Sequence, residues 1–439
     1  MMPIKAMKIY KYPSESAEKK VASIVNRGLG FNEKDFLEVK RILEDVRKNG
    51  DRAIIKYSNR FDSPMSDVET LKVTPDEIDT AEKNVSSSFV HSLNRAVLQI
   101  ENFHKHQLNR SWINTDRPGT FLGQLSNPVD AAGVYVPGGT EGNTPLVSSV
   151  LMGAIPAKIA GVKQISMVTP PKKDGTINSH LLVAAKKAGV DLIFKAGSAW
   201  AIAALAYGTE TIPKADIVVG PGNIYVMMAK KIVAGTVGID MVAGPSEIMV
   251  IADTEATPEF IAADLLSQAE HDIMASALLV TTSNEIAKRV VSTVKNQLEN
   301  LSRKEIAGKS LDNFGAIFVV PDLNFAMELA NRIAPEHLEL QIKDPFEYIG
   351  RIRNAGALFI GNYTPEPVGD YIAGPNHVLP TAGTARFSSP LSVDHFIKKT
   401  SLIYYSRETF ENEAEDIIRL AEIEGLDAHA NSVRIRLTK

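Results

Sequence analysis

From about residue 130 onward, the chain alternates short β-branched or apolar runs with alanine-rich segments of helical spacing. Strands that alternate with helices form βαβ crossovers, which produce mostly parallel sheets. The pattern therefore predicts an α/β fold, in which AGPSE (243–247) separates one βα set from the next. The predicted strands are 131–137, 165–169, 191–196, 216–220, 247–253, 276–282 and 316–320, and the predicted crossover helices are 146–159, 181–188, 199–207 and 225–233.

Residues 1 to about 125 have a different pattern, with charged faces and apolar residues at i, i+3 and i+4. This spacing is typical of amphipathic helices, and an example is the set Phe36, Val39, Ile42, Leu43 and Val46. The total of 439 residues suggests two to four domains. The first quarter of the chain therefore contributes helices and little visible chemistry.

Composition limits the chemistry and the partners of the chain. It has no cysteine, which excludes disulfides, a thiolate nucleophile and Cys-type zinc sites. Its net charge is only −4, with 48 basic and 52 acidic residues, so nucleic acid is a poor partner. The longest uncharged stretch (142–157) is too short to span a membrane, and residues 1–13 lack the apolar core of a secretory signal. We expect a cytoplasmic protein without membrane or nucleic-acid partners.

Two glycine-rich loops follow predicted strands, VPGGTEGNTP (136–145) and VVGPGN (218–223). Both lie where a parallel sheet binds ligands, at carboxyl ends of strands and starts of helices. Backbone N–H groups in such loops can contact a phosphate. Neither loop has the glycine spacing of a dinucleotide fingerprint or a P-loop, so simple tight turns explain them equally well.

Polar residues in irregular, Pro- and Gly-rich segments are the candidates for chemistry. Thr257-Pro258-Glu259 starts a helix that places Gln268 and His271 three residues apart on one face, where both could meet one ion. Taken alone, the pair is better explained as a polar end of the helix. Glu336 and His337 follow a proline and could activate water and accept a proton, although a surface loop is an equal alternative. The remaining candidates are Asp370 and His377 in 368–380, and Glu424 and His429 in 422–436.

Seven strings taken together resemble one known family, the histidinol dehydrogenases, in their order and approximate spacing. The resemblance runs from about residue 25 to the end of the chain. The strings are VYVPGG (134–139), VVGPGN (218–223), AGPSE (243–247), DLLSQAEH (264–271), APEHLEL (334–340), GDYIAGPNHVLPT (369–381) and AHANSVRIR (428–436).

The resemblance implies a reaction and a set of functional residues. Members of the family oxidise L-histidinol to L-histidine through an enzyme-held aldehyde with two NAD+, as the last steps of histidine biosynthesis. Glu336 and His337 match the catalytic pair, in which His337 takes the alcohol proton and Glu336 activates water. One Zn2+ per subunit is implied on Gln268, His271, Asp370 and His429, and it would anchor the substrate. The implied substrate contacts are Ser246, Gln268, His271, His337, Asp370, His377, Glu424 and His429, and the implied NAD contacts are Tyr135, Trp200 and Asn223.

Residue 200 departs from the family pattern. Trp200 stands where family members commonly have a glutamine that contacts NAD. An indole can stack on a nicotinamide or adenine face but supplies no amide acceptor. The sequence therefore leaves the cofactor contact at this position in doubt.

The resemblance also implies an architecture. The family has two large domains with incomplete Rossmann-like, mostly parallel sheets and two small, mainly helical segments, paired as an intertwined homodimer. The C-terminal segment would cross to the partner chain, so that Glu424 and His429 complete the other subunit's site. The expected parts are an N-terminal helical segment (1–28), a first α/β domain (29–133 and 247–390), a second α/β domain on the NAD side (134–246) and a small C-terminal domain (391–439).

Three alternatives remain open from the sequence. A related dehydrogenase could act on another diol or amino alcohol, such as a sulfonated propanediol. Such a substrate has no imidazole, so its binding gives less reason for the five residues Gln268, His271, Asp370, Glu424 and His429. A zinc hydrolase could use His337 to activate a metal-bound water, but the glycine loops would then have no cofactor to bind. A non-catalytic two-domain binding protein would give no reason for the Glu336–His337 pair.

Overall fold

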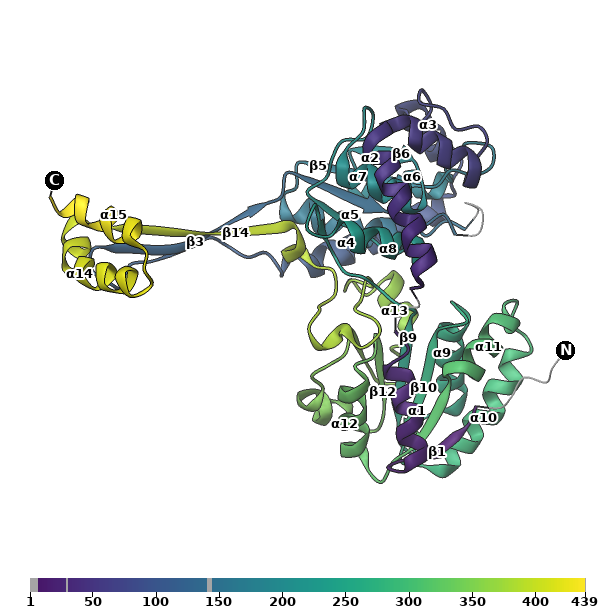
Figure 1. Cartoon of the computed structure of the whole chain (residues 1–439). Coiled ribbons are helices and arrows are strands. Elements are labelled where there is room, and N and C mark those ends of the chain that lie inside the picture. The colour runs from purple at the N-terminus through teal and green to yellow at the C-terminus, as the bar shows by residue number, and fades with distance from the viewer. Residues whose placement is uncertain (1–6, 29–30, 140–143, 439) are drawn as a thin grey trace. The chain divides into compact units, whose positions relative to one another are not determined.

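The computed structural model describes residues 7–28, 31–139 and 144–438, which form two compact units. The first unit contains the described residues up to 107 together with 130–396. The second contains 108–129 and the described residues from 397 onward. Figure 1 shows the elements of both units along the chain.

The first unit contains a six-stranded parallel sheet in the order β1-β11-β10-β9-β12-β13. Every residue of β9 is buried, and alternate side chains point to opposite faces of the sheet. Ile248 and Val250 pack with α9, α10 and α11, whereas Met249 and Ile251 pack with α1 and α12. This two-sided burial explains the continuous apolar run in the sequence. The strands are β1 (Ile9–Lys11), β9 (Glu247–Ala252), β10 (Ser276–Thr281), β11 (Ala316–Val319), β12 (His337–Gln341) and β13 (Ala357–Ile360).

Helices cover both faces of this six-stranded sheet (Figure 1). Short 3-10 turns and one short helix follow β12 and β13. The helices are α1 (Glu15–Val25), α9 (Pro258–Ala269), α10 (Asn284–Leu298), α11 (Lys304–Phe314), α12 (Leu323–Ile333) and α13 (Glu366–Tyr371), with turns at Pro345–Arg351, Thr384–Arg386 and Val393–Phe396.

A second parallel sheet of the first unit has five strands in the order β6-β5-β4-β7-β8. The order reverses at β4, which pairs with both β5 and β7. Helices α2, α7 and α8 share one core beside it, and α5 packs against α4 and α6. The strands are β4 (Ala131–Tyr135), β5 (Gln164–Thr169), β6 (Leu192–Lys195), β7 (Ile217–Val219) and β8 (Gly238–Ile239), and the helices are α2 (Glu33–Phe61), α3 (Pro75–Lys83), α4 (Ser87–Lys105), α5 (Val147–Ala160), α6 (Ser179–Ala188), α7 (Ser198–Tyr207) and α8 (Ile224–Val233).

The second unit is an antiparallel sheet with two helices. Strand β3 (Thr120–Pro128) lies between β2 (Trp112–Asn114) and β14 (Ile397–Tyr405). Helices α14 (Arg407–Ile423) and α15 (Asp427–Leu437) pack against each other.

The seven predicted strands and four predicted crossover helices are confirmed, so the α/β class with parallel sheets is correct. The second unit corrects the prediction of mainly helical small segments, because β14 and β3 pair along nine residues each. Their residues are largely half-buried or exposed, so they lack the apolar runs that mark the buried strands.

The predicted first domain (29–133 and 247–390) joins residues 33–61 to the strands that follow residue 247. The structure instead packs these residues beside the five-stranded sheet. Val39, Leu43 and Ile54 of α2 belong to the core that contains α7 and α8, on the five-stranded sheet. The amphipathic pattern predicts that a helix has a buried face but does not identify its partner. Strand β1, within the predicted helical segment 1–28, adds an edge to the six-stranded sheet.

No helix among the described residues is long and apolar enough to span a membrane.

Candidate active site

Glu336 and His337 lie where β12 begins, at the amino edge of the six-stranded sheet. Helix α12 ends at Ala334 in a left-handed conformation (φ 54°), and Pro335 prevents its continuation. The chain then turns into the strand, and both side chains are buried, with exposed fractions of 6% for Glu336 and 4% for His337. The sequence APEH therefore places two titratable groups in the interior rather than on a surface loop.

The backbone of Glu247, the first residue of β9, holds both members of the pair. Its N–H donates to Glu336 Oε2 at 3.0 Å, and its carbonyl oxygen lies 3.0 Å from His337 Nδ1. A carbonyl oxygen only accepts, so Nδ1 carries a proton and the neutral imidazole has its lone pair on Nε2. The Glu247 side chain pairs in turn with buried Arg27 at 2.5 Å.

Burial raises the pKa of Glu336 to about 7. The His337 charge and the Glu247 N–H oppose this rise in pKa, whereas the Glu247 and Glu366 carboxylates reinforce it. A carboxyl with such a pKa exchanges protons near neutral pH, which is the property required of a general base.

Gln268 lies in the last turn of α9, and His271 follows its end. Thr257 is the N-cap residue and Pro258 begins the helix as predicted, although the Thr257 side chain makes no capping hydrogen bond. The Gln268 side chain is buried, and its Oε1 accepts no hydrogen bond from the described residues. Burial of a carbonyl oxygen without a partner is costly, so this atom is suited to a cation ligand.

His271 is electrostatically coupled to Asp370 and His337. Loss of surrounding water lowers the pKa of His271, and the Asp370 charge partly opposes this change. The residue as a whole is exposed. A neutral imidazole is the form that binds a metal.

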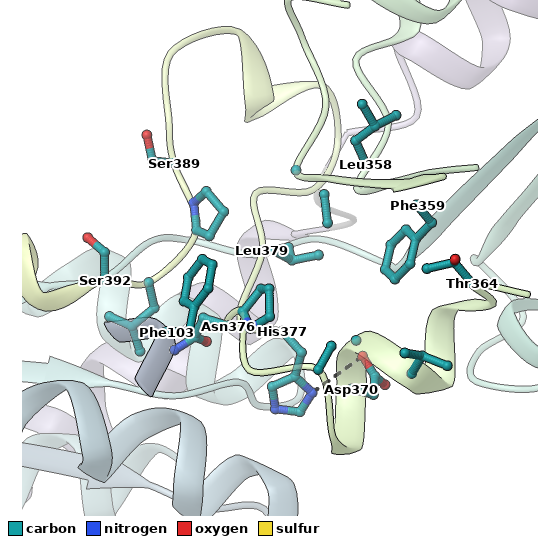
Figure 2. A pocket seen from close by; sticks show the side chains of 18 of the residues that line it. Phe103, Leu358, Phe359, Thr364, Asp370, Asn376, His377, Leu379, Ser389 and Ser392 are labelled. Atoms are coloured by element: carbon teal, nitrogen blue, oxygen red, sulfur yellow. Dashed lines mark ion pairs between the residues drawn. The ribbon is translucent and has the colours of Figure 1, made fainter. Parts of the chain in front are cut away.

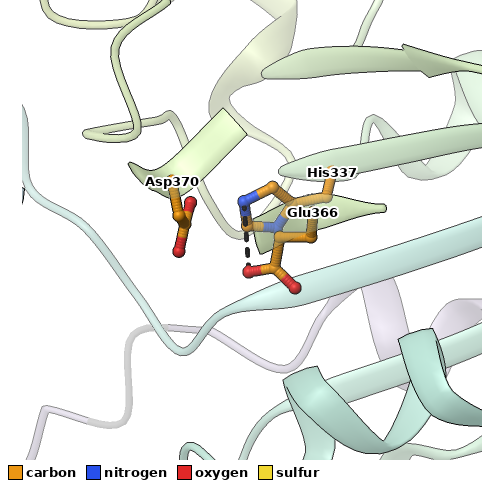
Figure 3. A group of neighbouring side chains, drawn as sticks. All are labelled: His337, Glu366 and Asp370. Carbon is orange, nitrogen blue, oxygen red and sulfur yellow. Dashed lines mark ion pairs between the residues drawn. The ribbon is translucent and has the colours of Figure 1, made fainter. Parts of the chain in front are cut away.

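Helix α13 places Glu366 and Asp370 one turn apart beside His337 (Figure 3). One ligand atom from each of the three side chains lies within 4.8 Å of the others, and His337 Nε2 is 3.6 Å from Glu366 Oε1. Of the four metal ligands implied by the sequence, only Asp370 belongs to this group. Burial, followed by the Asp370 charge, raises the pKa of Glu366 to about 8.

Burial also raises the pKa of Asp370, but the nearby His377 imidazole outweighs this effect and leaves the pKa below its usual value. His377 Nδ1 lies 3.7 Å from Asp370 Oδ1, and His377 Nε2 is buried without a partner among the described residues. Both side chains line a mostly apolar cavity of about 440 Å³, to which Phe103 of α4 and Phe359 of β13 contribute (Figure 2). An ionised Asp370 beside free imidazole nitrogen is a suitable environment for a cation or a cationic substrate.

Buried polar groups behind the site connect its three supporting elements. Gln341 of β12 donates through Nε2 to Asp264 of α9 at 2.7 Å and to Glu339 at 3.0 Å. Glu339 accepts from the N–H of Glu366 at 3.2 Å. Burial raises the pKa of both Asp264 and Glu339, and the two carboxyls share a hydrogen bond. The network therefore fixes α9 and α13 relative to β12.

The remaining predicted residues lie in three places. Ser246 is half-buried and directly precedes Glu247. Glu424 is the C-cap of α14 and His429 lies on α15; both are exposed and belong to the second unit. The first unit thus gathers Glu336, His337, His271, Asp370 and His377, with Gln268 beside His271.

The predicted NAD contacts Tyr135 and Asn223 follow adjacent strands of the five-stranded sheet. Tyr135 ends β4 and is buried, and its hydroxyl oxygen accepts from the N–H of Ser198 at 3.2 Å. Asn223 follows β7, caps α8 through its side-chain oxygen and is exposed. Part of the first glycine loop, 140–143, lies outside the described residues.

Trp200 lies in the core of the first unit, and its predicted contact with NAD stays a prediction. Its side chain is only 4% exposed, its Nε1 donates to Ser58 Oγ at 3.1 Å, and its ring stacks with those of Tyr57 and Phe61. These contacts place the indole in the core beside α2, where little ring surface remains for a nicotinamide or adenine. Helix packing at α7 explains Trp200 better than cofactor stacking does.

Sequence reasoning missed two residues of the site. Glu366 could have been found, because Glu366 and Asp370 are four residues apart and so share a helix face. Glu247 contributes through its backbone, and no side-chain pattern indicates that role.

Comparison with known proteins identifies the family of the chain. The family model described as histidinol dehydrogenase matches residues 30–437. Histidinol dehydrogenase of Carboxydothermus hydrogenoformans is 53% identical over 401 residues, which are 91% of this chain and 93% of that protein. That of Clostridium acetobutylicum is 51% identical over 430 residues, 98% of this chain and 99% of that protein. The crystal structure of histidinol dehydrogenase from Elizabethkingia anophelis has a TM-score of 0.92 at 40% identity and covers 98% of both chains. The resemblance inferred from the motifs is confirmed: the chain belongs to the histidinol dehydrogenase family.

Proposed function

We propose that this chain is an oxidoreductase of histidine biosynthesis that oxidises L-histidinol to L-histidine with two NAD+ and zinc. The observation that carries the proposal is the Glu336–His337 pair, held by the Glu247 backbone beside Asp370. Family membership supports the same reaction. The buried pair argues against a non-catalytic binding protein, because burying a carboxyl costs stability that such a protein has no reason to lose.

The proposed zinc ligands are Gln268, His271 and Asp370, with His429 as the fourth. The unpartnered Oε1 of Gln268 and the ionised Asp370 support this set, and two nitrogens with two oxygens suit Zn2+. When bound, zinc supplies an anchor for the imidazole and amine of the substrate. Ser246, His377 and Glu424 are the proposed further substrate contacts.

His337 is the general base in this proposal. Its protonated Nδ1 is fixed by the Glu247 carbonyl, which leaves Nε2 to take the proton of the substrate hydroxyl. Glu366 Oε1 lies 3.6 Å from Nε2, and the ionised form of this carboxyl stabilises the imidazolium that forms.

Glu336 activates the water that adds to the aldehyde. Its pKa of about 7 leaves a fraction of the carboxylate free to accept a proton from water at neutral pH. Hydration gives a second hydroxyl for the second oxidation. Buried surroundings keep the aldehyde in place between the two steps.

The five-stranded sheet is the proposed NAD+ domain, corresponding to residues 134–246. Tyr135 and Asn223 follow β4 and β7, the adjacent strands at which the strand order reverses, and such a point is where dinucleotides bind in open α/β sheets. NAD+, when bound, supplies the hydride acceptor for both oxidations. Trp200 is not needed for this arrangement.

Glu424 and His429 are proposed to complete the site of the partner subunit in an intertwined homodimer, through the small C-terminal domain 391–439. Both are exposed and belong to the second unit, so their polar groups are free to meet another chain. A cytoplasmic location is proposed with this function.

The experiment that tests the proposal is the NADH yield per L-histidinol consumed, before and after chelation and zinc restoration. We expect a ratio near two that requires the metal. A ratio of one would limit the enzyme to alcohol oxidation, and turnover without NAD+ would favour a zinc hydrolase. Faster NADH formation from small diols than from histidinol would favour the related diol dehydrogenase.

A further inference from the structure

Lys230 and Asp240 form a buried ion pair beside the five-stranded sheet. Lys230 lies in α8 and Asp240 directly follows β8. Their side chains are 1% and 0% exposed, and the ammonium contacts Asp240 Oδ1 directly. Neither side chain takes part in the proposed chemistry, which involves the other sheet.

Both charged groups also bind one peptide segment, that of Gly220 in the VVGPGN loop. Asp240 Oδ2 accepts from the Gly220 N–H at 2.8 Å, and Lys230 Nζ donates to the Gly220 carbonyl at 2.9 Å. Asp240 Oδ1 also accepts from the N–H of Met241 at 2.7 Å. The pair therefore fixes both polar backbone groups of a single glycine: Asp240 holds its N–H and Lys230 holds its carbonyl.

Gly220 needs this support because its conformation is unusual. Its φ of 118° is one that side chains rarely adopt, and a Cβ atom here would overlap the carbonyl oxygen of Tyr135. Close packing against Tyr135 joins the ends of β4 and β7 at the edge proposed to bind NAD+. Three residues later, Asn223 caps the start of α8.

A buried ion pair is a poor device for stability alone, because the cost of desolvating two charges often exceeds their attraction. Apolar residues would fill the same space at less cost, but they could not hold the N–H and carbonyl of Gly220. The pair thus selects one loop conformation.

We propose that Lys230 and Asp240 are positioning residues that preorganise the Gly220 loop to receive NAD+. The inference rests on the proposed function, since it assumes that the edge formed by Tyr135 and Gly220 is the dinucleotide site. Preorganisation lowers the ordering cost of binding, so its loss should weaken NAD+ more than any other ligand.

The test compares Lys230→Met and Asp240→Asn with the control Lys231→Met, in the zinc-loaded full-length protein. Lys231 is the next residue of α8 and is exposed. Titration calorimetry with NAD+ and, separately, with L-histidinol gives two dissociation constants for each protein. We expect at least a tenfold weaker NAD+ affinity in both test variants and less than a twofold change for histidinol. Lys231→Met should change neither.

The double variant Lys230→Met with Asp240→Asn separates two effects: the loss of contacts to Gly220 and the burial of an unpaired charge. It removes both buried charges, so the melting temperature should recover towards wild type, whereas NAD+ affinity should stay low because the Gly220 carbonyl still lacks its donor. Asp240→Asn keeps an acceptor for the Gly220 N–H but removes the charge that holds the Lys230 ammonium in place, so the loop loses part of its support. This milder change keeps the test measurable even if Lys230→Met folds poorly.

Unchanged NAD+ affinity in folded Asp240→Asn and in the double variant would overturn the inference. Equal weakening of NAD+ and histidinol would also overturn it, since it indicates general loss of structure. A wild-type protein that binds histidinol but no NAD+ would instead refute the proposed function.

Discussion

The two sheet edges of the first unit hold their polar groups in different ways. At the amino edge of the six-stranded sheet, side chains with displaced pKa values converge, among them the buried Glu336 and Glu366 and the half-buried Asp370. At the carboxyl edge of the five-stranded sheet, the backbone of Gly220 is fixed by a buried ion pair. In the proposed function the first edge transfers protons, because titratable side chains can exchange them, and the second edge binds NAD+, because a glycine backbone lets a ligand approach closely.

The largest expected effect separates these two edges. His337→Asn keeps a polar side chain but removes the base, so oxidation of histidinol should fall by about 10²–10⁴-fold. NAD+ and histidinol affinities should change little, because only the proton acceptor is lost. NADH formation and calorimetry measure both quantities, with the exposed His91→Asn as control. Wild-type rates in His337→Asn would contradict the assigned base.

The next effect tests which side chains at the first edge hold zinc. Gln268→Leu should weaken zinc binding by more than about 100-fold, the upper end for loss of a supporting contact, because it removes a proposed ligand. Glu366→Gln should retain zinc and lower the rate of oxidation. Metal content after dialysis against a chelator compares the two variants. Loss of zinc only in Glu366→Gln would indicate that the metal binds at the His337, Glu366 and Asp370 group instead.

A third prediction concerns pH and Glu336. Burial raises its pKa from 4.5 to about 7 in the folded chain, so the folded state binds more protons than the unfolded state between these values. The stability contributed by this group is therefore present below pH 4.5 and is lost as pH rises through 7. Between pH 5 and pH 8, the unfolding free energy of wild type should fall by about 2 kcal/mol. The unfolding free energy of Glu336→Gln should not show this fall.

Urea unfolding at the two pH values measures this difference, and the exposed Glu69→Gln serves as control. Parallel pH dependence in wild type and Glu336→Gln would show that Glu336 is ionised at both pH values.

The buried strands were predictable because each is apolar on both faces, as in β9 and β10, where all residues are buried. Strand β14 was not, since most of its residues are exposed and its pairing with β3 depends on a segment about 270 residues away. The partner of α2 was also unpredictable, because an amphipathic face does not say which sheet it covers.

The candidate site shows the same limit. Side chains such as Glu336, His337 and Asp370 carry recognisable chemistry in the sequence. The backbone contacts of Glu247 and the fixation of Gly220 by Lys230 depend on tertiary structure alone. Local patterns therefore find reacting groups more readily than the groups that position them.

The smallest expected effect concerns Trp200, which the sequence associated with the second edge and the structure places in the core. Trp200→Phe keeps an aromatic ring beside Tyr57 and Phe61 but removes the hydrogen bond to Ser58. We expect a loss of about 1 kcal/mol in unfolding free energy. The NAD+ dissociation constant should stay within twofold of wild type. If instead the stability is unchanged and NAD+ binding weakens strongly, the indole contacts the cofactor after all, and the second edge binds its ligand through an aromatic side chain as well as through backbone.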